Sequence, residues 1–316
     1  MRMSIPGLIC FFTLFMSMVL ASAQVKMEYV AHSCFVIESP QGIRILIDPY
    51  NTNRWLGYQF PDEIKADAVL VTHPHYDHDA NYHVSFQAPV FREPGRFSVG
   101  DVRLQGLMGK HADPYGKDFG QMNTIWVIEA GGKRFVHLGD NGPLTEQLVK
   151  DVGTVDVLLA PIDSTYHILK QVEIESILEA VKPRFLVPMH YQIPELSSMR
   201  DLGPIDPWLE GSSNTTRLSE NRYQFEETLE DSTQILVFRP SPDVKPWVIE
   251  LRQAWAKGRE GLKLLTSSQA SEAAMRFTEA TQIAPRVIGF WSGLSTARRP
   301  RVRPSRPWGL CSEAWS

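Results

Sequence analysis

The most constraining feature of the sequence is a group of histidines and one aspartate that directly follows a short apolar segment. The apolar residues Ala68–Val71 have the composition of a buried strand, and Thr72-His73-Pro74-His75-Tyr76-Asp77-His78 comes next. Four side chains that bind metals therefore lie within six positions at the end of a strand, where a loop can turn them to one side. Core packing does not require so many polar groups, so the segment predicts a metal site.

Three later residues extend this set. His111 lies in a polar loop, Asp140 follows the apolar run Phe135–Leu138, and His190 follows Phe185–Met189. Each therefore lies near the end of a predicted strand, and loops at strand ends can converge on one site. Any one of the three is compatible with an ordinary solvated loop, but together they form an ordered set of metal donors.

The segment from Val25 to Pro240 alternates short apolar runs with Gly, Pro, Asn and Asp, a pattern typical of strands and turns. We expect an α/β or α+β layered domain over residues 24–240. The predicted strands are Tyr29–Glu38, Ile43–Ile47, Ala68–Thr72, Thr124–Glu129, Arg134–Leu138, Val155–Ala160 and Arg184–Val187, and the predicted helices are Leu144–Val149 and Ile174–Val181.

The ordered set of histidines and aspartates resembles the metallo-β-lactamase-fold hydrolase superfamily across Val25–Pro240. The resemblance implies a four-layer αββα sandwich with two metal ions between its sheets. Asp140 in place of a cysteine argues against the commonest true β-lactamases. The branch of L-ascorbate-6-phosphate lactonase and N-acylphosphatidylethanolamine phospholipase D is similar at His32-Ser33-Cys34-Phe35, Leu46-Ile47-Asp48-Pro49 and Met189-His190-Tyr191.

The same resemblance assigns seven ligands to two divalent metal ions. One ion takes His73, His75 and His111, the second takes Asp77, His78 and His190, and Asp140 bridges both. Zinc is the expected metal, and manganese and iron suit the same donors. Two ions would generate a metal-bound hydroxide at neutral pH, and Asp77 would hydrogen-bond the attacking water.

A second group of residues is expected near these ligands. Asp48 is expected to orient a ligand histidine, with a simple turn aspartate as the alternative. His32 either approaches the site in the same way or is a satisfied buried histidine. Tyr166, His167 and Tyr191 are candidates for substrate contact or leaving-group protonation, although surface polar residues have the same appearance in sequence.

The N-terminus has the three-part layout of a secretory signal. Arg2 precedes an apolar run, Ile5–Leu20, and the small residues Ala21-Ser22-Ala23 follow it. We therefore predict a signal peptide over residues 1–23 and export to the periplasm or the medium after cleavage behind Ala23. The alternative is an uncleaved membrane anchor. Only Cys34 and Cys311 would remain after cleavage, too few for a disulfide framework.

The composition changes twice after Pro240. Residues 241–289 predict a helical hairpin, with a break near Thr266-Ser267-Ser268. Residues 290–316 are rich in Arg and Pro and are expected to be disordered, as a basic arm, an exposed tail or a truncated second repeat. The hairpin is either packed on the main domain or has the spacing of one tetratricopeptide-like repeat, at Gly261, Leu264, Ala273, Phe277, Ala280 and Pro285.

Composition and charge narrow the class of function. The chain is 43% hydrophobic and 22% charged, which argues against disorder and against a polytopic membrane protein, and its net charge of −4 offers no reason to bind nucleic acid. We expect an exported metal-dependent hydrolase that cleaves an ester, lactone or phosphodiester bond of a small molecule. A phospholipase D-like phosphodiesterase at a membrane surface, or a non-catalytic metal-binding protein with a C-terminal interaction module, are the alternatives. The substrate and the oligomeric state stay open.

Overall fold

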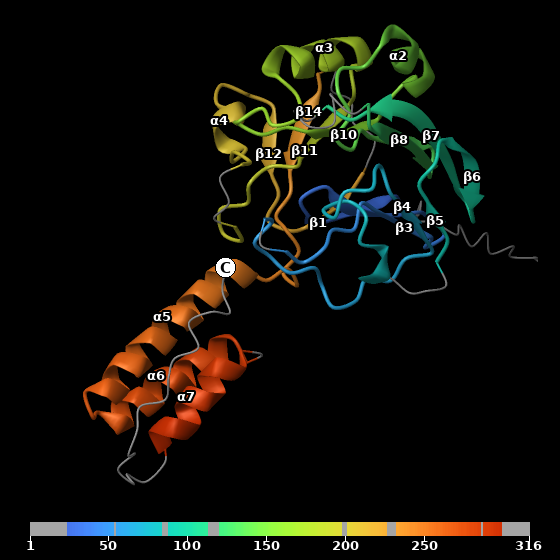
Figure 1. The fold of residues 1–316 in the computed structure, drawn as a ribbon. Coiled ribbons are helices and arrows are strands. Elements are labelled where there is room, and N and C mark those ends of the chain that lie inside the picture. The colour runs from blue at the N-terminus through green and yellow to red at the C-terminus, as the bar shows by residue number, and fades with distance from the viewer. Residues whose placement is uncertain are drawn as a thin grey trace, which may run out of the picture.

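The computed structural model describes residues 24–53, 55–83, 88–112, 120–197, 201–225, 232–285 and 287–298. These residues form two packed β-sheets (Figure 1). The predicted α/β class is confirmed. The first sheet has the order β13-β1-β2-β3-β4-β5, with β13 at Arg222–Gln224, β1 at Lys26–Ala31, β2 at Cys34–Glu38, β3 at Arg44–Ile47, β4 at Ala68–Leu70 and β5 at Val90–Phe91.

The second sheet has more strands than the first and contains the most deeply buried ones. Strands β9, β10, β11 and β14 run parallel, and every residue of β10 and β11 is buried, as expected for parallel strands covered on both faces. Its order is β12-β14-β11-β10-β9-β8-β7-β6, with β12 at Thr215–Arg217, β14 at Gln234–Val237, β11 at Phe185–Met189, β10 at Val157–Pro161, β9 at Lys133–His137, β8 at Met122–Ala130, β7 at Val102–Lys110 and β6 at Gly95–Val99.

Helices α2 (Glu146–Val152) and α3 (Gln171–Val181) lie on the outer face of this second sheet (Figure 1). The hydroxyl of Thr145 accepts a hydrogen bond from the Leu148 amide and so caps the start of α2. Helix α3 ends at Lys182, which has a left-handed conformation, and Pro183 follows. Both helices overlap the predicted ones, Leu144–Val149 and Ile174–Val181, but α2 begins two residues later and ends three residues later, and α3 begins three residues earlier. Two short helices, η1 (Asn81–His83) and α4 (Asp206–Leu209), lie in connections between strands.

Two sequence predictions about the strands were wrong. The run Tyr29–Glu38 is two antiparallel strands, β1 and β2, rather than one. The chain turns at His32, which has a φ of 58°, a conformation that the surrounding apolar residues do not signal. His111 follows the nine-residue strand β7 directly instead of lying within a polar loop. Glycines in β7 weaken its strand signal, which explains why the pattern missed it.

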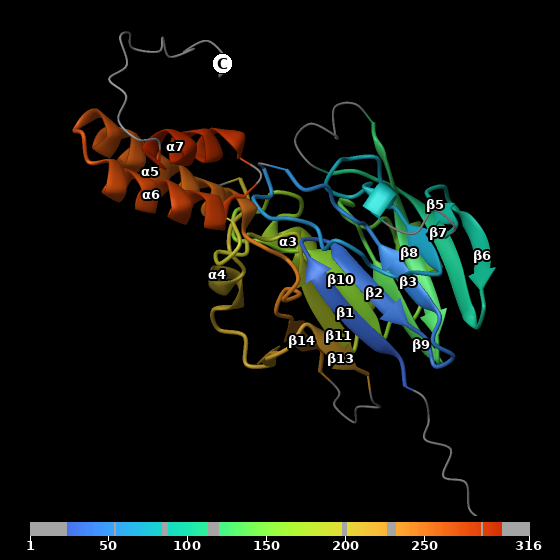
Figure 2. The same cartoon turned by 90° about the horizontal axis from the view of Figure 1, so that it is seen from below.

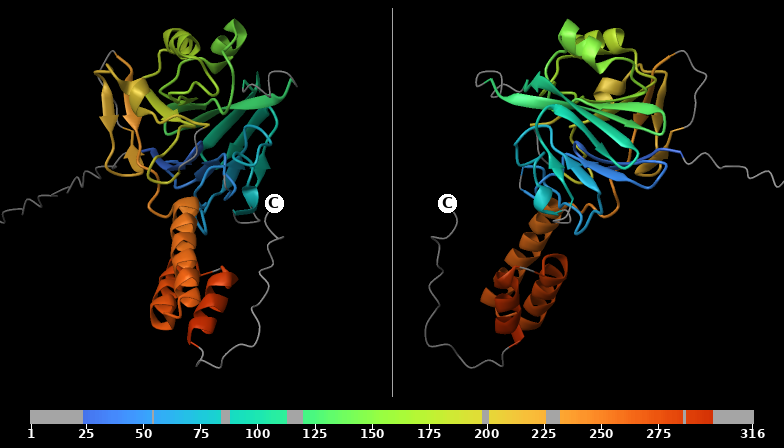
Figure 3. Two further views of the ribbon diagram at one scale, coloured as in Figure 1. Left: turned by 60° about the vertical axis from the view of Figure 1, so that its left-hand side comes forward. Right: turned by 90° about the vertical axis from the view of Figure 1, so that its right-hand side faces the viewer.

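After the sandwich, the chain continues into three helices, α5 (Trp247–Thr266), α6 (Ala270–Ile283) and α7 (Ile288–Arg298). They pack side by side and extend away from the two sheets (Figures 2 and 3). Their buried side chains form two small clusters separate from the main core, with Phe277 in one and Phe290 in the other. Among the described helices, none has both the length and the apolar composition needed to cross a bilayer.

The sequence predicts a disordered tail from residue 290, and this start is wrong. Residues 290–298 belong to helix α7. Phe290, Leu294 and Ala297 are buried at helical spacing, a pattern that the neighbouring Arg/Pro-rich composition obscured. The predicted signal peptide at 1–23 and residues 299–316 lie outside the described residues.

Candidate metal centre

The predicted metal donors come together at one end of the sandwich, on the loops that follow β4, β7, β9 and β11. Their donor atoms form overlapping groups, and within each group all the atoms lie within 4.8 Å of one another. The groups are His73, His75 and His111; His32, Asp77, His78 and His190; and His73, His78 and Asp140. All seven sequence-predicted ligands are present in these groups, and His32 joins them.

Asp140 lies between the first two groups. Its Oδ2 atom is 3.5 Å from Nε2 of His111 and 3.2 Å from Nε2 of His190, while its Oδ1 atom is 3.4 Å from Nε2 of His78. One carboxylate thus faces histidines of both groups. This is the position that a carboxylate must occupy to bind two neighbouring cations.

A buried hydrogen-bonded chain behind the donors fixes two histidine tautomers. Asp48 Oδ2 is 2.8 Å from both His78 Nδ1 and Thr72 Oγ1, and Thr72 Oγ1 is 2.9 Å from His73 Nδ1. The Thr72 hydroxyl donates its only proton to the Asp48 carboxylate, so it must accept from His73 Nδ1. Both histidines then carry a proton on Nδ1, which leaves Nε2 as the ring atom that faces the cluster and can bind a metal.

Asp48 therefore contacts a ligand histidine, as the sequence led us to expect. No function was assigned to Thr72 from the sequence. The position of Thr72, directly before His73 and just after a buried strand, is the sequence feature that could have indicated its role. Through Thr72, the Asp48 carboxylate is linked to His73 of the first donor group, in addition to its direct contact with His78 of the second.

Thr72→Val should weaken metal binding about 10–100-fold with little change in fold, because valine keeps the shape but cannot accept the His73 Nδ1–H. A zinc titration against a competing chelator measures this. The matched control is Thr281→Val, since Thr281 is also buried but donates to a backbone carbonyl within α6. Parent-like affinity in Thr72→Val would show that the tautomer chain has no influence on the metal site.

His32 approaches the second donor group through Asp77. Its Nε2 atom lies 3.1 Å from Asp77 Oδ2, and its ring centroid lies 4.3 Å from that of His190. His32, Asp48, Tyr166 and His190 are among the few non-glycine residues with positive φ. Such strained backbone conformations persist when surrounding contacts enforce them, and here they gather at the candidate site.

Burial and neighbouring charges shift the pKa values of several side chains in the cluster. Burial and the adjacent His78 lower the pKa of His73 well below its usual value. Burial opposes ionisation of His78 and Asp140 as well, but Asp140, Asp77 and Asp48 raise the pKa of His78, and His190 and His78 hold the pKa of Asp140 well below its usual range. The carboxylates therefore stay ionised and attract positive charge into the centre.

The donors fit divalent transition metals. Imidazole nitrogen and carboxylate oxygen are the donor types that zinc, manganese and iron share. Within the described residues, the buried atoms His78 Nε2 and Asp140 Oδ1 have no hydrogen-bond partner, although they lie 3.4 Å apart. Buried polar atoms left in this state are costly unless a ligand satisfies them.

The three residues predicted to contact substrate or protonate a leaving group, His167, Tyr166 and Tyr191, differ in their surroundings. The ring of His167 stacks on His190 with centroids 5.8 Å apart, so His167 lies beside the donors. The Tyr166 hydroxyl instead donates to Gln171 Oε1 at the start of α3. Tyr191 is buried, and burial raises the pKa of its hydroxyl above the usual value, so this hydroxyl stays protonated.

Two residues near the donors, Asp163 and Trp55, were not predicted from the sequence. Asp163 accepts hydrogen bonds from the backbone amides of His167 and Gly203 and so shapes the turn that carries His167. Trp55 has its ring centroid 6.4 Å from that of His190 and donates to Asp201. A loop aspartate and a loop tryptophan have no distinctive spacing, so no sequence signal pointed to them.

Comparison with known proteins agrees with this geometry. Residues 26–190 match the family model of the beta-lactamase superfamily domain. The chain belongs to this superfamily. A UPF0173 metal-dependent hydrolase from Carboxydothermus hydrogenoformans is 27% identical over 194 residues, which cover 52% of this chain and 84% of that protein. A second UPF0173 metal-dependent hydrolase, from Thermococcus onnurineus, is 29% identical over 192 residues, covering 53% and 84%.

A solved structure from Thermotoga maritima, assigned as a candidate zinc-dependent hydrolase of the metallo-β-lactamase superfamily, has 27% identity and a TM-score of 0.53 and covers 68% of this chain and all of its own. The predicted superfamily and two-sheet fold are thereby confirmed. The protein is a metal-dependent hydrolase of this superfamily, and hydrolase relatives imply a small-molecule substrate. The relatives do not separate the lactonase-like branch from others.

Proposed function

We propose that the protein is an exported hydrolase that holds two divalent metal ions, with zinc the expected metal, and cleaves an ester, lactone or phosphodiester bond. The observation that carries this proposal is the position of Asp140 between two groups of donors. Its Oδ2 atom faces His111 of the first group and His190 of the second, and its Oδ1 atom faces His78 of the second group. A site for a single ion has no need of this shared carboxylate.

His73, His75 and His111 would hold one ion, and Asp77, His78 and His190 the other, with Asp140 shared. Two ions held by these donors would lower the pKa of a bound water and polarise the scissile carbonyl or phosphoryl oxygen. The protein's own contribution is to fix the donors.

Two side chains at the cluster are suited to move or hold a proton. Asp77 receives a hydrogen bond from His32, which fixes one of its oxygens and leaves the other to accept from an attacking water. His167 is half-buried and stacked on His190, a position from which its ring can protonate a leaving group. No side-chain nucleophile is needed for this scheme.

The test is a substrate panel run on the metal-loaded full chain. Zinc-loaded and manganese-loaded protein would be assayed on lactones, 4-nitrophenyl esters and bis(4-nitrophenyl) phosphate. We expect turnover on at least one class, loss of that turnover on chelation and its return on metal addition. Metal-loaded protein that cleaves none of the three classes would contradict the proposed reaction.

Export rests on the sequence of the first 23 residues. We expect cleavage after Ala23, which leaves Gln24 as the first residue, because Arg2, the apolar run and Ala21-Ser22-Ala23 have the order of a secretory signal. Intact-mass measurement of protein from the exported fraction tests this. Full-length protein still carrying Met1 in the membrane fraction would indicate an anchor instead.

A further inference from the structure

Several exposed apolar side chains of the hydrolase domain lie close in sequence to residues of the candidate metal centre. Among the described residues between 24 and 240, the large apolar side chains most open to solvent are Tyr76, Tyr82, Met108, Met122, Tyr166 and Val172. Four of them lie within four positions of His75, His78, His111 or His167 in the sequence. Met122 joins them, because it pairs with Lys110 next to His111. The segments that carry the donors therefore also carry apolar side chains that are open to solvent.

Two of these side chains, Met108 and Met122, line a pocket of about 620 Å³. It is bounded by the end of β7, the start of β8, the turn after Asp140 and helix α2, which lies near β7 (Figure 1). Its apolar lining residues are Leu107, Met108, Ala112, Met122, Pro143 and Leu148. The volume is in the range of pockets that hold small ligands.

The walls of this pocket include part of the metal centre. His111 is itself a lining residue, and Asn141, another, directly follows Asp140. Backbone hydrogen bonds connect these two walls, from Ala112 N to Asp140 O and from Gly142 N to Lys110 O. The pocket therefore adjoins the chain segments that carry His111 and Asp140, whose side chains are themselves buried.

We propose that this pocket binds a hydrocarbon chain of the substrate while the bond to be cleaved lies at the metal centre. The inference rests on the proposed function, since it extends the same site. Met108 and Met122 are exposed by 64% and 48%, and burying them against a hydrocarbon chain is favourable. Methionine side chains adapt to apolar partners of varied shape, so chains of different length fit.

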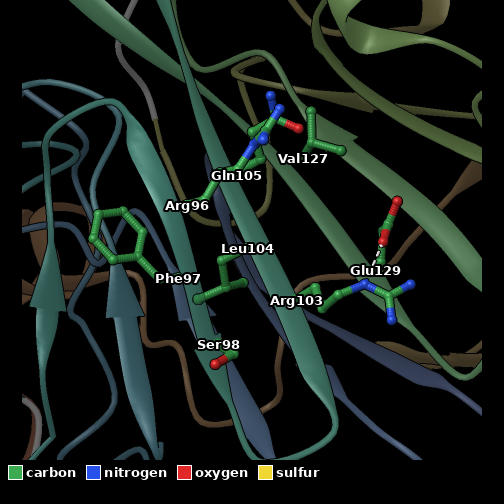
Figure 4. Close-up of a pocket in the computed structure, with 8 residues that line it drawn as sticks. All are labelled: Arg96, Phe97, Ser98, Arg103, Leu104, Gln105, Val127 and Glu129. Atoms are coloured by element: carbon green, nitrogen blue, oxygen red, sulfur yellow. Dashed lines mark hydrogen bonds and ion pairs between the residues drawn. The ribbon is translucent and has the colours of Figure 1, made fainter.

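A second pocket differs from the first because it lies away from the metal centre. It lies on the outer face of β6, β7 and β8 around Arg103, at the opposite end of β7 from His111 (Figure 4). Arg103 donates to Glu129 across the strands, so these charges satisfy each other. This second pocket contains no metal donor.

The experiment compares ester chain length on the zinc-loaded full chain. We expect kcat/KM for 4-nitrophenyl esters to rise about fourfold per methylene from acetate toward octanoate, until the pocket is filled. Met108→Gln and Met122→Gln should each reduce the preference for octanoate over butyrate at least about threefold, because each loses apolar contact with several methylenes. Met275→Gln is the matched control, a methionine exposed by 59% on α6, outside the pocket, and should keep the preference.

A binding measurement separates this inference from the reaction. Calorimetry should show that octanoate binds more tightly than butyrate, with the difference reduced in Met122→Gln, and thermal unfolding should show that each variant folds. If octanoate binds in this way but no ester, lactone or phosphodiester is cleaved, the proposed function fails and the pocket assignment stands. Equal kcat/KM for butyrate and octanoate esters, or an unchanged preference in both pocket variants, would overturn the pocket assignment.

Discussion

Asp140→Asn should lower kcat/KM by roughly 10³-fold, equivalent to about 4 kcal/mol of transition-state stabilisation, and should reduce the affinity for both metal ions. Asparagine keeps the shape of the side chain but removes the negative charge. That charge lies within 3.5 Å of nitrogen atoms from both donor groups, on His78, His111 and His190. The measurement is metal content after loading and dialysis, together with steady-state kinetics on whichever substrate the panel identifies.

The result distinguishes a bridging carboxylate from an ordinary ligand. Loss of affinity at both metal positions supports the bridge. A variant that loses one metal and keeps the other at parent affinity would mean that Asp140 serves a single ion.

Asp77→Asn should have the second-largest effect, a loss of about 10²-fold or more in turnover together with loss of one of the two metals. Asp77 Oδ2 lies 3.5 Å from His78 Nε2 and 3.1 Å from His32 Nε2, within the second donor group only. The first donor group, His73, His75 and His111, is unchanged in this variant, so one ion should stay bound. Elemental analysis and kinetics of the same preparation measure both effects.

Asp79→Asn is the matched control for this prediction. Asp79 lies two residues further along the loop, but both of its carboxylate oxygens accept hydrogen bonds from Arg92, so it is not directed at the cluster. It should keep parent metal content. Asp77→Asn with two metals and a rate within a few-fold of the parent would exclude Asp77 from the site.

The sequence predicted most of the donors because they follow apolar runs typical of buried strands, and His111, which follows the glycine-containing strand β7, is the exception. The run Ala68–Val71 and the residues after it place His73 and His78 at a strand end, and Asp140 and His190 follow runs of the same kind. Parallel strands bring such ends to one edge of a sheet. This rule brings Asp140 and His190, which follow β9 and β11, to one edge of the second sheet. His73 and His78 follow β4 of the first sheet, and they meet the other donors because the two sheets pack together.

The parts that sequence did not predict depend on contacts between distant residues. The contact of His32 with Asp77 needs a positive φ at His32, within an otherwise apolar run that reads as one strand. The role of Thr72 depends on Asp48, which is 24 positions away in the chain. The pocket needs β7, whose glycines weaken its pattern, to lie beside α2. None of these relations has a local periodicity.

Metal stoichiometry tests the central claim most directly. The full chain would be loaded with zinc, or with manganese or iron in parallel, dialysed against metal-free buffer and analysed for metal per mole of protein. The geometry of Asp140 between two donor groups predicts close to two ions per chain, with activity lost on chelation while most of the fold is kept. One ion per chain at saturation, or none with any of the three metals, would contradict a two-metal centre.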